Sequence, residues 1–129
     1  MKIIFTCDID WASEAVINDS LSLFEQNNIK CTLFATHKSK VIDLCNRKLF
    51  EIGIHPNFNQ SIISGSGLSA EKTIKKITQI YPEAIGVRSH SLTTSSPLLE
   101  IFKSFGMIYE SNQHVPYSKT IKPYKCWNE

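Results

Sequence analysis

The chain has 129 residues and carries 14 Lys and Arg against 12 Asp and Glu, so its formal net charge is +2. This length predicts one domain or part of one, and a hydrophobic fraction of 42% excludes intrinsic disorder. The lysines are scattered and the charge is nearly balanced, which argues against a nucleic-acid partner. No apolar run reaches the roughly 20 residues of a membrane-spanning helix, and the N-terminal apolar stretch meets Asp8 too soon for a signal peptide. We therefore expect a cytoplasmic protein without a membrane span.

The cysteines form no C-x-x-C pair, which argues against both a disulfide framework and a zinc ribbon. We expect reduced thiols, three of them packed in strands or on a helix face. The cysteines are Cys7, Cys31, Cys45 and Cys126.

Apolar runs that stop at polar residues predict five short strands. In chain order, the strands are expected over residues 2–7, 31–36, 50–55, 84–87 and 107–109. Residues 111–129 are expected to be irregular, although their end resembles the start of a further strand.

Helical patterns fill the first two connections between these strands. Ser13 can cap the first helix, which we expect to end at Asn27 and Asn28. The apolar residues at helical spacing in this first helix are Ile17, Leu21 and Phe24. Ser39 can cap a second, short helix. The inner face of that short helix is expected to consist of Val41, Leu44 and Cys45.

Two further helices are expected in the second half of the chain, after a long connection over residues 56–68 with the Ser- and Gly-rich composition of a loop. Ser69 can cap the first of them, and Pro82 closes it. The residues expected to face inward from this helix are Ile74, Ile77 and Tyr81. The last helix begins with Ser96 at N-cap and Pro97 at the first helical position, and it stops at Gly106. Its apolar stripe is Leu98, Phe102 and Phe105.

Five strands alternating with four helices predict an α/β fold with a parallel sheet. In such folds the carboxyl ends of the strands lie at one edge, where ligands bind. Most residues that can bind a metal or transfer a proton follow those ends. In chain order they are Asp8 and Asp10, His37, residues 55–59, residues 88–91 and residues 110–112.

Three groups of residues at these ends could carry chemistry. Asp8 and Asp10 form a D-x-D pair that could share a cation or divide the roles of base and ligand, or could simply precede and cap a helix. His55 offers an imidazole at a strand end. Arg88 at the end of a buried strand needs a carboxylate partner or a bound anion, and Asp8 is the natural partner. The residues that follow, His90 and Ser91, could contact the reacting groups or be ordinary loop residues.

The order of these groups resembles the polysaccharide deacetylase family, which is NodB-like and also called carbohydrate esterase family 4. The sequence TCDID at residues 6–10 resembles its first motif, and CTLF at residues 31–34 resembles its second-strand pattern. The run FEIGIH at residues 50–55 resembles the strand that opens its H-x-x-x-H motif, and GVRSHS at residues 86–91 falls where its arginine motif belongs. The resemblance covers residues 3–112 and looks closest to the WbmS-like branch associated with surface-polysaccharide biosynthesis.

The resemblance implies a partial (β/α) barrel and a metal-dependent hydrolase that removes the N-acetyl group of a sugar or polysaccharide precursor. By this resemblance Asp10, His55 and Asn59 would bind a divalent metal, with zinc as the default. Asp8 would be the general base, while Arg88 would keep it ionised and oriented. The remaining site residues would be His90 in the catalytic set and Asn57 and Ser91 on the substrate.

The chain departs from the family pattern in two respects. Asn59 stands where the second histidine of the H-x-x-x-H motif belongs, which weakens the case for zinc unless His90 supplies the missing nitrogen. A full (β/α) barrel takes roughly 250 residues, so residues 1–129 are expected to be a single, C-terminally truncated domain. The partner strands would then come from elsewhere, and a homo-oligomer could cover the open sheet edge.

Two alternatives differ in class from a deacetylase. The first is an inactive carbohydrate-binding or assembly module derived from the same family, favoured by Asn59 and by the missing C-terminal motifs. The second is a magnesium-dependent phosphoryl-transfer or glycosyltransferase enzyme built on the D-x-D pair. That alternative leaves His55 and Arg88 without a role.

Overall fold

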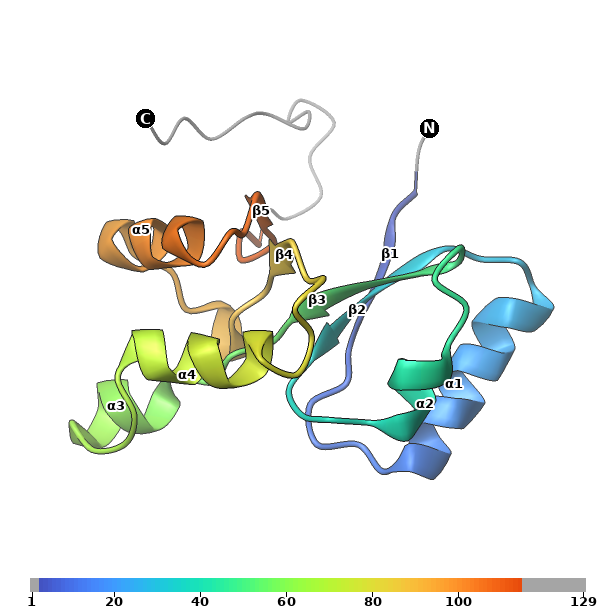
Figure 1. The fold of residues 1–129 in the computed structure, drawn as a ribbon, viewed down its shortest axis with the longest axis horizontal. Coiled ribbons are helices and arrows are strands. Elements are labelled where there is room, and N and C mark those ends of the chain that lie inside the picture. Colours follow the sequence, from blue (N-terminus) through green and yellow to red (C-terminus); the bar gives the residue numbers. More distant parts are fainter. Residues whose placement is uncertain (1–2, 115–129) are drawn as a thin grey trace.

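The computed structural model describes residues 3–114, which contain one parallel sheet of five strands. The order of the strands in the sheet is their order in the chain, β1 to β5 (Figure 1). The strands are β1 Phe5–Asp8, β2 Cys31–Ala35, β3 Phe50–Ile54, β4 Gly86–Val87 and β5 Tyr109–Glu110. The predicted number, order and direction of the strands are confirmed, although every strand is shorter than predicted and β1, β4 and β5 begin later in the chain.

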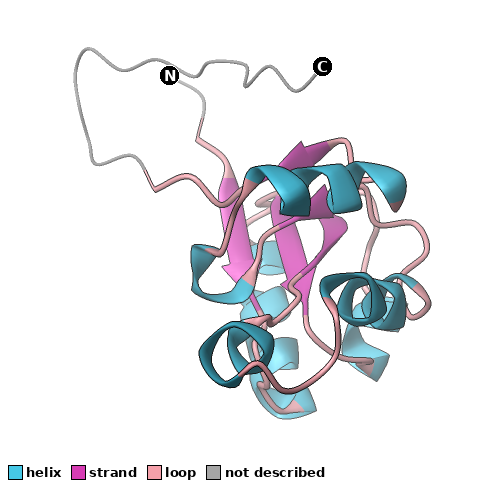
Figure 2. Cartoon of the chain, turned by 90° about the vertical axis from the view of Figure 1, so that its left-hand side faces the viewer, coloured by secondary structure: helices cyan, strands magenta, loops and turns pink. Residues whose placement is uncertain are grey.

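Helices connect the strands and lie around the sheet (Figure 2). They are α1 Glu14–Gln26, α2 Lys40–Leu44, α3 Asn59–Ser64, α4 Ala70–Thr78, α5 Ser96–Ser104 and the short 3₁₀ helix η1 His90–Leu92. None of these helices within residues 3–114 has the length and hydropathy needed to cross a membrane.

Serine side chains begin the helices largely as predicted. The hydroxyls of Ser13, Ser39 and Ser69 accept hydrogen bonds from backbone N–H groups in the first turns of α1, α2 and α4. In α5 the predicted cap is wrong by one residue, because Ser95 rather than Ser96 accepts the N–H of Leu98.

Two further predictions about helices are wrong. The connection over residues 56–68 contains α3, which has no buried residue and therefore leaves no apolar stripe in the sequence. In α2 the side chain that is fully buried is Ile42, whereas the predicted Leu44 is 87% exposed. The predicted Val41 and Cys45 are partly buried and pack against the core. A five-residue helix makes little more than one turn, so its apolar residues define no face by themselves.

The hydrophobic core lies between the helices and one face of the sheet. The strands contribute alternate residues to it, as expected for side chains that point to opposite faces of a strand. The main contributors from the strands are Cys31, Leu33, Phe50, Ile52, Ile54 and Val87. The helices cover them mainly with Ile17, Leu21, Ile42, Ile74, Ile77, Leu98 and Phe102.

Aromatic rings pack against glycines in neighbouring strands on the opposite face of the sheet. A Cβ atom at Gly53 in β3 would lie 2.6 Å from the Phe34 ring of β2, so only glycine leaves room for this ring. A Cβ atom at Gly86 would likewise meet the ring of Tyr109. This face also lines a hollow of about 360 Å³ with Thr6, Thr32, Phe34, Glu51 and Tyr109 among its walls.

Within residues 3–114, β1 and β5 form the two edges of the sheet. The expectation that a second copy covers such an edge stays a prediction. The final segment that resembles the start of a further strand lies outside the described residues, as does Cys126.

Candidate metal centre

The parallel sheet brings the predicted site residues to its carboxyl edge. Asp8 is the last residue of β1, and His55 directly follows β3. Arg88 follows β4, and His90 begins η1 two residues later. Asp10 and His55 are far apart in the sequence, but the parallel sheet brings the segments that follow β1 and β3 to the same edge (Figure 1).

Asp10 lies in a tight turn after β1. The N–H of Ala12 donates to the carbonyl of Ile9 over 2.9 Å, which closes the turn over residues 9–12. Asp10 has a φ of 39°, in the left-handed region that asparagine and aspartate tolerate better than most residues. This backbone conformation turns its carboxylate toward the histidines at the ends of β3 and β4.

His55 is almost fully buried, with 3% of its surface exposed. Its Nδ1 atom lies 2.6 Å from the carbonyl oxygen of Arg88. Because a carbonyl only accepts hydrogen bonds, Nδ1 donates to it, and Nε2 is the nitrogen that faces Asp10 and could bind a metal. Nε2 lies 3.3 Å from Oδ1 of Asp10. A hydrogen bond of this kind behind a ligating imidazole is the usual means of fixing its orientation.

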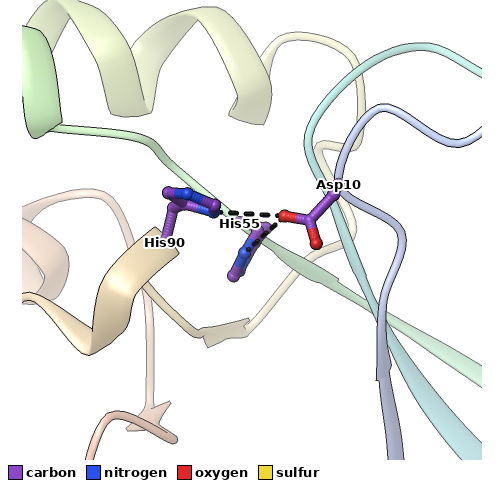
Figure 3. Close-up of side chains that lie close together, drawn as sticks. All are labelled: Asp10, His55 and His90. Carbon is purple, nitrogen blue, oxygen red and sulfur yellow. Dashed lines mark hydrogen bonds and ion pairs between the residues drawn. The ribbon is translucent and has the colours of Figure 1, made fainter.

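His90 approaches the same oxygen of Asp10 as His55 does, as Figure 3 shows. Its Nδ1 atom lies 3.1 Å from Oδ1 of Asp10, and its ring centre is 5.5 Å from that of His55. The Trp11 ring packs edge to face against the His90 ring, with 5.2 Å between the two ring centres.

The three side chains fit a divalent cation. Two imidazole nitrogens and one carboxylate oxygen, from Asp10, His55 and His90, all lie within 4.8 Å of one another. Several electron-pair donors that face one point repel each other unless a proton or a metal ion lies between them. Imidazole together with carboxylate is a donor set typical of zinc.

Asp8 and Arg88 form an ion pair beside this cluster. Nη1 of Arg88 lies 2.9 Å from Oδ1 of Asp8, as the sequence predicts. Three further guanidinium hydrogens go to Thr6 and to the backbone and hydroxyl oxygens of Ser111. The guanidinium is therefore fixed on several sides, and it orients the carboxylate, whose Oδ1 lies 4.0 Å from Nδ1 of His55.

The other predicted site residues lie between β3 and α3, at the start of α3 and in η1. Nδ2 of Asn59 donates to the hydroxyl of Ser91 over 3.1 Å, and Oδ1 of Asn57 accepts the backbone N–H of Asn59. These contacts join the start of α3 to η1. The roles of Asn59 as a metal ligand and of Asn57 and Ser91 on the substrate stay predictions.

One contact of the site is not predicted from the sequence. His37, which follows β2, has its Nδ1 atom 3.1 Å from the carbonyl oxygen of Asp10. Its position at a strand end points to the site, but the sequence does not indicate that it contacts the backbone rather than a ligand.

Two comparisons with known proteins found relatives of this chain. The family model described as WbmS-like polysaccharide deacetylase matches residues 5–129. A crystal structure of a candidate polysaccharide deacetylase involved in O-antigen biosynthesis, from Bordetella bronchiseptica, is 32% identical and superposes with a TM-score of 0.91. That similarity covers 98% of this chain and 54% of the other. No curated protein matches the chain.

The structural similarity confirms the predicted fold, because the five parallel strands and their helices correspond to part of a deacetylase-like (β/α) fold. The chain spans about half the length of this relative, since it covers 54% of it. With a family model that matches nearly its whole length, the chain belongs to the WbmS-like polysaccharide deacetylase family.

Proposed function

We propose that this chain provides the metal-binding and base-bearing part of a deacetylase that hydrolyses the N-acetyl group of a surface-polysaccharide sugar. The observation that carries the proposal is the convergence of Asp10, His55 and His90 on one point, with the Asp8–Arg88 pair beside it. Family membership supports the substrate class, since polysaccharide deacetylases act on acetylated sugars. The magnesium-dependent alternative gains no support, because it leaves both His55 and Arg88 without a function.

Asp10, His55 and His90 would hold the cation, with His90 in place of the histidine that Asn59 replaces. Zinc is our choice of metal because two imidazole nitrogens accompany the single carboxylate. When bound, such an ion would polarise the acetyl carbonyl and lower the pKa of a coordinated water to about 7.

Asp8 would accept the proton of the attacking water. Its Oδ1 atom is held by Arg88 at 2.9 Å, which leaves Oδ2 as the oxygen available for the proton. Arg88 would orient this carboxylate, and its positive charge would stabilise the ionised form that accepts the proton. Asn57 and Ser91, on the connections after β3 and β4, would contact the sugar at the rim of the cluster.

The test is acetate release from an N-acetylglucosamine oligomer by the purified chain in the presence of zinc or cobalt. We expect Asp8→Asn to abolish release while the metal stays bound, because the substitution removes the base but no ligand. We expect His55→Ala and His90→Ala to lose the metal. Asn59→Ala is the matched control for the ligand set, and it should keep the metal if His90 is the third ligand.

The outcomes separate the proposal from its alternative. Binding of the oligomer without acetate from any variant would support the inactive carbohydrate-binding module. Loss of metal in Asn59→Ala but not in His90→Ala would restore Asn59 as the ligand. Acetate release that is unchanged in His55→Ala would overturn the metal-dependent mechanism altogether.

A further inference from the structure

The position of the Asp10 carboxylate depends on an unfavourable backbone conformation. Asp10 is the second residue of the turn over residues 9–12, and its φ of 39° lies in the left-handed region. A turn with negative φ at this residue is sterically easier for an aspartate, and it would point both the carbonyl and the carboxylate elsewhere. Some contact must therefore favour the observed turn over the easier one.

His37 makes the contact that can supply this preference. Its Nδ1 atom lies 3.1 Å from the carbonyl oxygen of Asp10 and 2.9 Å from Oγ1 of Thr36. A carbonyl oxygen only accepts, so Nδ1 donates its hydrogen to Asp10, and the Thr36 hydroxyl shares it. The donated bond exists only in the turn that directs the Asp10 carbonyl toward β2.

The segment that carries His37 is held by contacts from α1 and from the connection that follows α4. The buried Tyr81 hydroxyl donates to the carbonyl of His37 and accepts the N–H of Ser39. The Glu14 carboxylate accepts the hydroxyl of Ser39 and two N–H groups at the start of α2. The backbone at His37 is therefore fixed independently of Asp10, so that its imidazole can impose a position on Asp10.

We propose that His37 is a positioning residue, which holds the turn over residues 9–12 in the conformation that directs the Asp10 carboxylate at His55 and His90. The proposal rests on the proposed function for its metal-binding consequence only. The effect on the turn itself belongs to the metal-free protein and can be measured without any metal.

The test uses variants of the full chain at residue 37 whose side chains place an N–H group at different positions. An asparagine side chain places its N–H near the position of Nδ1, whereas glutamine places it near Nε2. We expect His37→Ala and His37→Gln to bind cobalt(II) about tenfold more weakly than the unaltered chain, with His37→Asn close to the unaltered chain. His114→Ala changes an exposed histidine outside the cluster and should have no effect.

The second readout is hydrogen exchange of the Ala12 amide in the metal-free protein, followed by NMR. We expect about tenfold faster exchange in His37→Ala and His37→Gln, and near-normal exchange in His37→Asn, because this amide closes the turn. Equal exchange in all variants, or an asparagine variant that behaves like alanine, would overturn the proposal. Failure of the unaltered chain to bind cobalt would overturn the proposed function instead, and the exchange data would still decide the role of His37.

Discussion

The guanidinium of Arg88 lies over the ring of Phe34, with 4.5 Å between its central carbon and the ring centre. Phe34 is fully buried, so the stacked contact is shielded from water on one side. The same guanidinium holds Asp8 at its edge. The residue that orients the proposed base is thus anchored by packing as well as by hydrogen bonds.

Replacing Arg88 by lysine keeps the charge but removes the flat, branched group. We expect Arg88→Lys to lower the free energy of unfolding by about 1–3 kcal/mol, because an ammonium can neither stack in this way nor reach Asp8, Thr6 and Ser111 together. Urea denaturation measures the change. Arg47→Lys is the matched control, since its ion pair with Glu83 is exposed and should change stability by less than about 1 kcal/mol. Equal losses in the two variants would contradict the anchoring role.

Gly53 should not tolerate even one additional carbon. We expect Gly53→Ala to destabilise the fold by about 1–3 kcal/mol, because the new Cβ would lie 2.6 Å from the ring of Phe34 and 3.0 Å from the carbonyl oxygen of Gly86. Thermal unfolding of Gly53→Ala, Phe34→Leu and the double variant tests the cause. The smaller leucine should recover part of the loss, so purely additive effects would argue against the clash.

Cys31 should be the least reactive thiol among the cysteines in the described residues. Burial raises its pKa to about 11, so about one molecule in a thousand carries the thiolate at pH 8. We expect iodoacetamide to label Cys7 and Cys45 in the native protein and Cys31 only after unfolding in urea, as measured by mass spectrometry of the peptides. Native labelling of Cys31 at the rate of Cys45 would show that this face of β2 is open to solvent.

The ionised Glu14 carboxylate should stabilise the fold at neutral pH and lose this effect at acidic pH. Its pKa is lowered chiefly by the hydrogen bond from the backbone of Val41, with Ser39 and Lys40 adding to the effect. A carboxyl whose pKa is lower in the folded state stabilises the fold at pH values above its unfolded pKa of about 4.3. That contribution is lost as the pH falls through the lower folded pKa. We expect Glu14→Gln to be less stable at pH 7 and to lose less stability between pH 6 and 3, by urea denaturation at each pH.

The arrangement of strands and the location of the site could be predicted because both depend on repeated, local patterns. Five apolar runs ending in polar residues are enough to place Asp8, His55 and Arg88 at one edge of a parallel sheet. The Arg88–Asp8 pair followed from the cost of leaving a cation without a partner at that edge. None of these steps needs knowledge of a loop conformation.

The predictions that failed concern short or solvent-exposed segments. The α3 helix buries no residue, so nothing in its Ser- and Gly-rich sequence distinguishes it from a loop. The side chain that α2 buries depends on the direction in which the chain leaves β2, and a five-residue helix does not encode that direction. The contact between His37 and Asp10 depends on the conformation of two loops, and no residue pattern specifies it.

The three side chains that could bind a metal follow strands that are not all hydrogen-bonded to one another. β1 is hydrogen-bonded to β2, while His55 and His90 follow β3 and β4 on the other side of β2. An ion held by Asp10, His55 and His90 would therefore cross-link β1 to the far strands over the top of β2. Such a bridge would resist any change in the curvature of the sheet. Removal of the ion by a chelator would then loosen the pairing of β1 with β2 before the pairing of β2 with β3.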